Sequence, residues 1–131
     1  LKYWAHERVA YVMADVHQVV DVLGVMGAVV AFECLEHIVD AAGMVAALAG
    51  TLGSGGAFLA SVPNEEVWPF EAGHFAYDDS PHVRHYRPVE FDTLLTGAGL
   101  SVTDRFTQHG KRGEVVSGTD GRSLVYLALK P

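Results

Sequence analysis

The sequence predicts an α/β domain built on a mostly parallel β-sheet, and two apolar segments joined by a helix support this prediction. The first segment covers residues 26–32 and is rich in valine and alanine. The second covers residues 57–62 and directly follows a glycine-rich stretch. Short apolar runs of this kind indicate buried strands, and a helix between two of them makes a right-handed βαβ unit. With 131 residues, 50% of them hydrophobic, the chain suits a single domain with a modest core.

An earlier segment is predicted to add one short strand. Residues 9–14 form an apolar run that we interpret as a buried strand ending at Asp15. A carboxylate at this position is either a helix cap or a ligand contact at the open edge of an α/β sheet. The residues alone leave both interpretations open.

A helix is predicted over residues 40–52, between the two strands of the βαβ unit. Asp40 is a favourable N-cap residue, and Gly53 is placed to end the helix in a left-handed cap. Helical spacing puts four apolar residues on one face, which we expect to pack against the sheet. These residues are Val45, Leu48, Ala49 and Leu52.

The C-terminal third predicts a helix followed by an antiparallel hairpin. Pro88 suits a first helical turn, so the helix is predicted over residues 88–98. Strands are predicted over residues 100–106 and 123–129, joined by a long glycine-containing turn. Two such strands can pair antiparallel.

A long irregular segment, residues 63–88, is rich in aromatic residues and histidines. Loops longer than about 15 residues inside a compact domain usually carry function. Aromatic walls bind flat organic molecules, imidazoles orient a hydroxyl, and a guanidinium holds a carboxylate or phosphate. The alternative is a surface loop whose aromatic rings only cover the end of the sheet. The candidate substrate-binding residues are His74, His82, Arg84, His85 and Tyr86.

Composition argues against several function classes. The formal net charge is −7, and only nine lysines and arginines are scattered along the chain, so a nucleic-acid partner is not expected. No stretch of 18 clean apolar residues is present, so no membrane span is expected. Cys34 is the single cysteine, which excludes an internal disulfide and fits a reducing cytoplasm.

Three motifs in order resemble the class I S-adenosylmethionine-dependent methyltransferases. They are FECLEHI, then LGSGGAFLASVPN, then HYRPVEFDTLLTGAGLSV, and the resemblance covers residues 9–102. It implies a Rossmann-like, doubly wound, mostly parallel sheet whose last strand is inserted antiparallel between its two predecessors. It also implies S-adenosylmethionine as the cofactor and methyl transfer to oxygen, nitrogen or carbon of a small-molecule acceptor.

Two features of that family have no counterpart in this sequence. The glycine-rich loop after the first strand and the acidic residue that ends the second strand would both precede Leu1. We therefore expect residues 1–131 to be a single partial domain that lacks the N-terminal strands and binds the cofactor weakly by itself. A catalytically dead domain kept as a binding module is the alternative without enzymatic activity.

The resemblance assigns roles to residues at the ends of the predicted strands. Asp15 would accept from the adenine amino group, and the backbone N–H of Val16 would face the ring. Phe32 and Glu33 would lie beneath the methionine part of the cofactor. Because methyl transfer from a sulfonium is an in-line displacement, a base is needed only where the acceptor loses a proton. His37 is the candidate base, or else it simply caps or packs its helix.

A metal site is the alternative interpretation of the same cluster. On a helix, Glu33, Glu36 and His37 would have the spacing i, i+3, i+4 and would share one face. Together with His82, this pattern is similar to the Mg²⁺- or Mn²⁺-dependent small-RNA 2′-O-methyltransferases. An oxygen-containing ligand set suits such hard cations better than zinc. The primary prediction contains no metal, and this alternative contains one.

Overall fold

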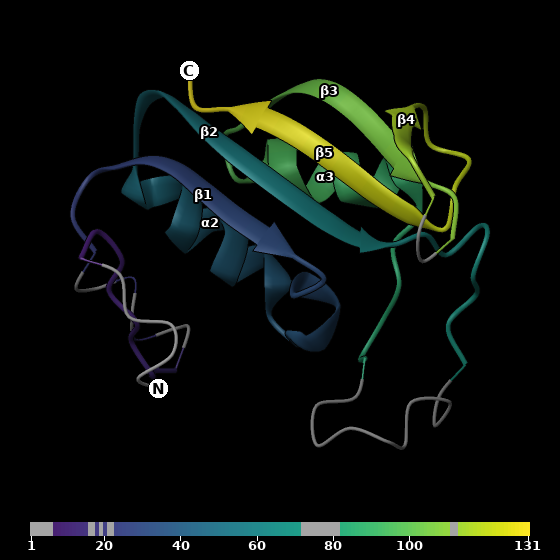
Figure 1. Ribbon diagram of the computed structural model, residues 1–131, viewed down its shortest axis with the longest axis horizontal. Coiled ribbons are helices and arrows are strands. Elements are labelled where there is room, and N and C mark those ends of the chain that lie inside the picture. Colours follow the sequence, from purple (N-terminus) through teal and green to yellow (C-terminus); the bar gives the residue numbers. More distant parts are fainter. Residues whose placement is uncertain (1–6, 16–17, 19, 21–22, 72–81, 111–112) are drawn as a thin grey trace.

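The computed structural model describes residues 7–15, 18, 20, 23–71, 82–110 and 113–131. Five strands form one sheet in the order β1-β2-β5-β3-β4 (Figure 1). The strands are β1 (Met26–Phe32), β2 (Leu52–Pro63), β3 (Ser101–Gln108), β4 (Val115–Ser117) and β5 (Ser123–Leu129). The helices are α2 (Ala41–Thr51), α3 (Pro88–Gly97) and the short 3₁₀ helix η2 (Leu35–His37).

The sheet confirms the predicted α/β class. Strands β1 and β2 are parallel and are connected through α2, as expected for a βαβ unit. Strand β5 lies between β2 and β3 and is antiparallel to both. The C-terminal strand is therefore inserted between β2 and β3, which precede it in the chain together with the short β4. This is the arrangement that the family resemblance implies.

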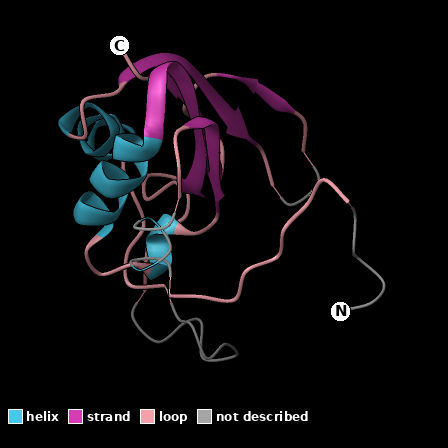
Figure 2. Ribbon diagram, turned by 90° about the vertical axis from the view of Figure 1, so that its left-hand side faces the viewer, coloured by secondary structure: helices cyan, strands magenta, loops and turns pink. Residues whose placement is uncertain are grey.

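Both α-helices lie on the same face of the sheet (Figure 2). The side chain of Asp40 caps α2 by accepting a hydrogen bond of 2.9 Å from the backbone N–H of Gly43, which confirms the predicted N-cap. The predicted left-handed cap at Gly53 is wrong, because Leu52 is already extended and starts β2. Left-handed backbone occurs two residues later, at Gly55.

The core fills the space between the two helices and the covered face of the sheet. Along β5, buried side chains alternate with half-buried ones, because successive residues point to opposite faces. The ring of Phe91 on α3 packs against the ring of Tyr126 on β5, with 4.7 Å between the ring centroids. The largest fully buried apolar side chains are Phe58, Tyr86, Phe91, Tyr126, Leu35, Met44, Leu95 and Leu124.

Strand β1 has the predicted bounds but is less buried than predicted. Its side chains at Val30 and Phe32 are 60% and 51% exposed. Among the described residues, β1 has one neighbouring strand, β2, and α2 covers only one of its faces. An edge strand with one covered face cannot bury every side chain, although its composition is that of a buried strand.

The predicted strand over residues 9–14 is wrong. These residues have no regular strand structure beyond an isolated bridge at Val9, and their side chains are exposed. Met13, for example, is fully exposed. A strand needs a neighbour that completes its hydrogen bonds, and no named strand of the described residues lies beside this segment.

The C-terminal half follows the prediction apart from one short element. Helix α3 and strand β5 lie where the apolar pattern predicts them, and β3 continues two residues beyond its predicted end. Strand β4 was not predicted: it has three exposed residues and pairs with the end of β3. Three residues are too few to show a hydrophobic period.

No helix among the described residues is long and apolar enough to cross a membrane.

Candidate functional site

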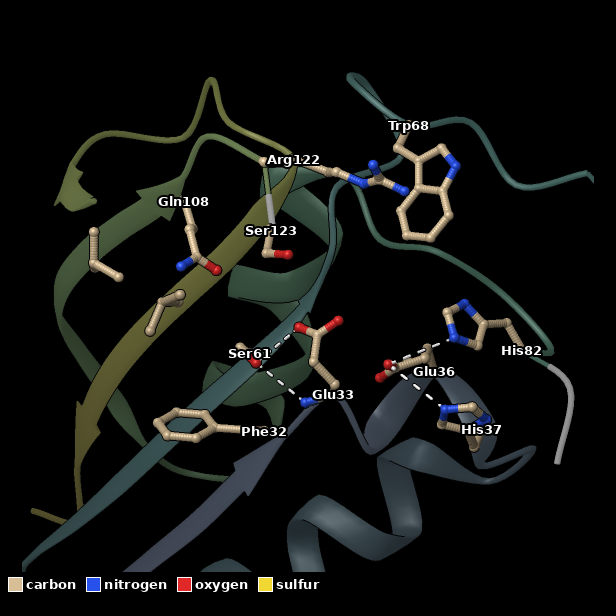
Figure 3. A pocket seen from close by; sticks show the side chains of 13 residues that line it. Phe32, Glu33, Glu36, His37, Ser61, Trp68, His82, Gln108, Arg122 and Ser123 are labelled. Atoms are coloured by element: carbon tan, nitrogen blue, oxygen red, sulfur yellow. Dashed lines mark hydrogen bonds and ion pairs between the residues drawn. The ribbon is translucent and has the colours of Figure 1, made fainter. Parts of the chain in front are cut away.

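A cavity of about 620 Å³ opens where β1, β2 and β3 end and β5 begins (Figure 3). Carboxyl ends of parallel strands meet at this edge of the sheet, which is where open α/β sheets bind their ligands. The volume lies within the range of small-molecule sites. The lining residues are Phe32, Glu33, Glu36, His37, Ser61, Trp68, His82, Gln108, Gly110, Val115, Arg122, Ser123 and Val125.

Glu33 forms the turn at the end of β1 and is attached to β2 through Ser61. Its backbone N–H donates to the Ser61 hydroxyl at 3.1 Å, and that hydroxyl donates to Glu33 Oε1 at 2.8 Å. Glu33 has a φ of 45°, which is uncommon for a residue with a side chain. Such backbone conformations concentrate at functional sites, where the surrounding contacts maintain them.

Glu36 is the most unusual group in the cavity. Its side chain is completely buried, and neither carboxylate oxygen has a hydrogen-bond partner among the described residues. Burial raises the pKa of this carboxyl to about 7, and the nearby negative charge of Glu33 adds to the rise. A buried carboxylate without hydrogen bonds is costly unless a cation or a ligand completes its environment.

Two imidazoles face the Glu36 carboxylate. His37 Nε2 lies 3.7 Å and His82 Nε2 lies 3.9 Å from Glu36 Oε1 (Figure 3). These distances exceed those of hydrogen bonds. One potential ligand atom from each of the three residues lies within 4.8 Å of the other two. Atoms that bind one divalent cation at about 2.2 Å lie at most about 4.4 Å apart, so small side-chain movements would bring these three groups onto one cation.

Backbone contacts bring His82 to this position. The N–H of Val83 donates to the carbonyl of Glu36 at 2.8 Å, which attaches the end of the long irregular segment to η2. Further along, Tyr86 and Asn64 form an isolated β-bridge that brings the two ends of that segment together. His82 therefore reaches Glu36 although 45 residues separate them in the sequence.

A chain of hydrogen bonds determines which nitrogen of His82 can bind a cation. His85 Nδ1 lies 2.7 Å from the carbonyl of Trp68, which can only accept, so this nitrogen carries a proton. In neutral His85, Nε2 is then the acceptor for His82 Nδ1 at 2.9 Å. The lone pair of His82 is left on Nε2, the nitrogen that faces Glu36.

The structure brings together five of the residues that the sequence singles out. Phe32, Glu33, Glu36, His37 and His82 line the cavity. Glu33 precedes η2 and its carboxylate is hydrogen-bonded to Ser61, so Glu33, Glu36 and His37 do not share one helical face. Among the described residues, Glu36, His37 and His82 form a group that could hold a cation.

The other predicted site residues lie elsewhere. Tyr86 is buried in the core and donates its hydroxyl to the Leu35 carbonyl at 3.3 Å. The Arg84 guanidinium stacks on the Tyr86 ring, outside the large cavity. His85 supports His82 from a buried position, and Asp15 is in an exposed segment away from the cavity lining. Val16 and His74 lie outside the described residues.

Four polar lining residues were not recognised from the sequence: Ser61, Gln108, Arg122 and Ser123. Ser61 and Gln108 lie at or near the carboxyl ends of strands, and Ser123 begins β5, so their positions offered a signal. Trp68 belongs to the aromatic segment that was expected to line or cover the acceptor pocket, and it lines the cavity. Arg122 follows a glycine in a turn, and nothing in its sequence neighbourhood indicates that it reaches the same cavity.

Several solved structures with the same fold are methyltransferases. A possible histamine N-methyltransferase from Thermotoga maritima has a TM-score of 0.67 and 15% identity, covering 83% of this chain and 58% of its own. The N-methyltransferase NodS from Bradyrhizobium japonicum, in complex with S-adenosyl-L-homocysteine, has a TM-score of 0.66 and 17% identity over 99% and 57%. A SAM-dependent methyltransferase from Archaeoglobus fulgidus has a TM-score of 0.71 and 12% identity over 98% and 71%.

These likenesses confirm the fold implied by the sequence motifs. No protein-family model matches this chain, and no curated protein matches its sequence. The chain spans less than two thirds of the length of the Thermotoga and Bradyrhizobium structures. It therefore has the fold of the C-terminal part of a class I methyltransferase domain.

Proposed function

We propose that this chain is the part of an S-adenosylmethionine-dependent methyltransferase that binds a small-molecule acceptor. The observation that supports the proposal best is the cavity at the carboxyl ends of the strands, lined by Glu33, Glu36 and His37 in a methyltransferase fold. A fold alone does not define a reaction, whereas these side chains supply the chemistry of the site. S-adenosylmethionine, when bound, supplies an electrophilic methyl group on sulfur.

His37 is the general base of the proposed reaction. Its imidazole can take a proton from the acceptor near neutral pH. Glu36 Oε1 lies 3.7 Å from His37 Nε2, beside the proposed base. Phe32 and Glu33 lie on the wall formed by the end of β1, where the family resemblance puts the methionine part of the cofactor. The cavity holds the acceptor in alignment and excludes water.

Calorimetric titration of the full-length protein with S-adenosylhomocysteine tests this proposal. We expect binding in the micromolar range that is independent of Mn²⁺. Incubation with radiolabelled S-adenosylmethionine and a cell extract should then place label in the small-molecule fraction. Lack of cofactor binding by the full-length protein would refute both enzymatic proposals and favour the binding module.

A metal-dependent methyltransferase is the second candidate, and the buried Glu36 favours it specifically. Its two unpartnered oxygens and the Nε2 atoms of His37 and His82 form a ligand set for a cation. A bound Mg²⁺ or Mn²⁺ would neutralise the carboxylate and polarise an acceptor hydroxyl. By resemblance, that hydroxyl would be the 2′-OH of an RNA, although the net charge of −7 disfavours an RNA partner.

Mn²⁺ binding by the full-length protein separates the two candidates. Electron paramagnetic resonance would show Mn²⁺ bound by the wild type and not by Glu36→Ala if the metal site exists. Glu66→Ala, which removes an exposed carboxylate outside the cavity, is the matched control. Label in the RNA fraction together with Glu36-dependent Mn²⁺ binding would replace the metal-free proposal by the second candidate.

If the metal site exists, His85→Phe is expected to weaken Mn²⁺ binding by about 10-fold to 100-fold. The substitution keeps a ring among Trp68 and Phe70 but removes the acceptor for His82 Nδ1–H. His109→Phe, at an exposed histidine that does not line the cavity, should leave Mn²⁺ affinity unchanged. Equal Mn²⁺ affinity in both variants would show that the histidine chain does not orient the ligand.

A further inference from the structure

Arg122 presents a positive charge to the cavity from the side opposite the carboxylates. Its guanidinium carbon lies 3.8 Å from the centroid of the Trp68 ring, a close cation–π contact. Figure 3 shows the guanidinium stacked on the indole, while Glu36 and His37 lie at the other side of the cavity. Arg122 is the only lysine or arginine among the described lining residues.

The loop that carries Arg122 is held in place by buried hydrogen bonds. Asn64 Nδ2 donates to the carbonyls of Thr119 at 2.9 Å and Gly121 at 2.8 Å. The backbone N–H of Asn64 donates to the carbonyl of Arg122 itself at 2.8 Å. The backbone N–H of Gly121 donates to the Thr107 hydroxyl at 2.7 Å. Arg122 is therefore attached to a rigid support, which lowers the entropic cost of binding a ligand.

Asn64 also positions the partner ring. The backbone carbonyl of Asn64 accepts hydrogen bonds from the backbone N–H groups of Val67, at 3.2 Å, and Trp68, at 2.8 Å. One buried side chain and its backbone thus organise both members of the stacked pair. Such preorganisation of a charged group at a cavity wall is typical of ligand recognition rather than of a solvated surface charge.

The guanidinium is available to an anionic ligand. Among the described residues, no carboxylate forms an ion pair with Arg122, and its side chain contacts the Trp68 ring. A stacked guanidinium keeps its edge free for the bidentate hydrogen bonds that carboxylates and phosphates accept. The cavity wall also contains the apolar side chains Phe32, Val115 and Val125.

We propose that the acceptor is a small organic acid whose carboxylate or phosphate binds Arg122. This inference rests on the proposed methyl transfer and specifies its substrate class. The apolar body of the acid would contact Phe32, Val115 and Val125 on the cavity wall. Its nucleophilic atom would then lie at the end of the cavity that contains His37 and Glu36. Those two residues would serve as the base and its partner.

Paired ligands test this proposal with the full-length protein. The probes are hydroxylated aromatic and aliphatic acids, including phosphate monoesters, each compared with a neutral amide or alcohol counterpart. Ligand-observed NMR, with S-adenosylhomocysteine present, measures each affinity for wild type, Arg122→Gln and Arg105→Gln. Arg105 is the matched control because it also stacks on an aromatic ring, that of Tyr126, outside the cavity.

We expect at least one acid to bind wild type and Arg105→Gln about 10-fold to 100-fold more tightly than its neutral counterpart. In Arg122→Gln this ratio should fall to about one, with unchanged affinity for S-adenosylhomocysteine. Three results would overturn the proposal: neutral ligands binding as well as acids, no acid binding at all, or an acid preference that survives Arg122→Gln.

Two further results would assign Arg122 to a different ligand. A loss of S-adenosylhomocysteine affinity in Arg122→Gln would mean that the guanidinium holds the carboxylate of the cofactor. Arg122-dependent binding of a single-stranded oligonucleotide would assign it to a nucleic-acid phosphate. The proposed methyl transfer is tested separately: it would be refuted if the wild type did not bind S-adenosylhomocysteine.

Discussion

Glu36→Gln is expected to stabilise the metal-free protein at pH 8 by about 1–3 kcal/mol. Burial raises the pKa of the Glu36 carboxyl in the folded protein from 4.5 to about 7. The folded state therefore binds this proton more tightly than the unfolded chain. Stability is highest when the carboxyl is protonated, below the unfolded pKa, and it decreases as the pH rises from about 4.5 to 7. Glutamine has the same shape, carries no charge and avoids this loss.

Urea denaturation at several pH values checks this expectation. The difference between Glu36→Gln and wild type should be near zero at pH 4 and should reach its full size above pH 7. A variant that is less stable than wild type at pH 8 would show that Glu36 has partners that stabilise its charge.

Stability measured with and without Mn²⁺ shows whether the Glu36 carboxylate binds a cation or only destabilises the folded protein. If Glu36 binds a cation, Mn²⁺ should raise the stability of the wild type at pH 8 and leave Glu36→Gln unchanged. At high Mn²⁺ concentration the wild type should then become more stable than Glu36→Gln. Active-site groups often lower the stability of the protein without its ligand, because their arrangement serves function at the expense of stability.

Asn64→Ala is expected to lower the free energy of unfolding by about 3 kcal/mol or more. The Asn64 side chain is fully buried and makes three hydrogen bonds, to Thr119, Gly121 and Glu66. Truncation removes all three and leaves backbone groups in the loop without their partners. Because the same bonds hold Arg122, the preference for acids over neutral ligands should decrease as well.

Thermal or urea unfolding measures the first effect, and the paired ligands measure the second. Thr103→Ala is a suitable control, since its hydroxyl donates one long bond of 3.3 Å to Leu127 at an exposed position. That variant should stay within about 0.5 kcal/mol of wild type. An Asn64→Ala protein as stable as Thr103→Ala would mean that water replaces the lost hydrogen bonds without cost.

Local sequence patterns were sufficient for most elements of this fold, although β4 was not predicted and β2 begins five residues before its predicted start. The apolar runs and their turn residues predict β1, α2, α3 and β5 within one or two residues, because their spacing reports which side chains are buried. The same reasoning failed for residues 9–14, whose composition is that of a strand. Strand formation depends on a neighbouring strand, and local composition carries no information about that neighbour.

In the candidate site, Glu36 and His37 are neighbours in the chain, so the sequence alone predicts that they lie together at the end of β1. Their position after an apolar strand predicts a functional edge of the sheet. The residues from distant parts of the chain that line the same cavity can be identified only from the folded structure. His82 reaches Glu36 through the backbone bond of Val83, and Arg122 reaches the same cavity through the buried bonds of Asn64. These contacts join residues far apart in the chain, and their geometry exists only once the sheet has brought β2, β3 and β5 together.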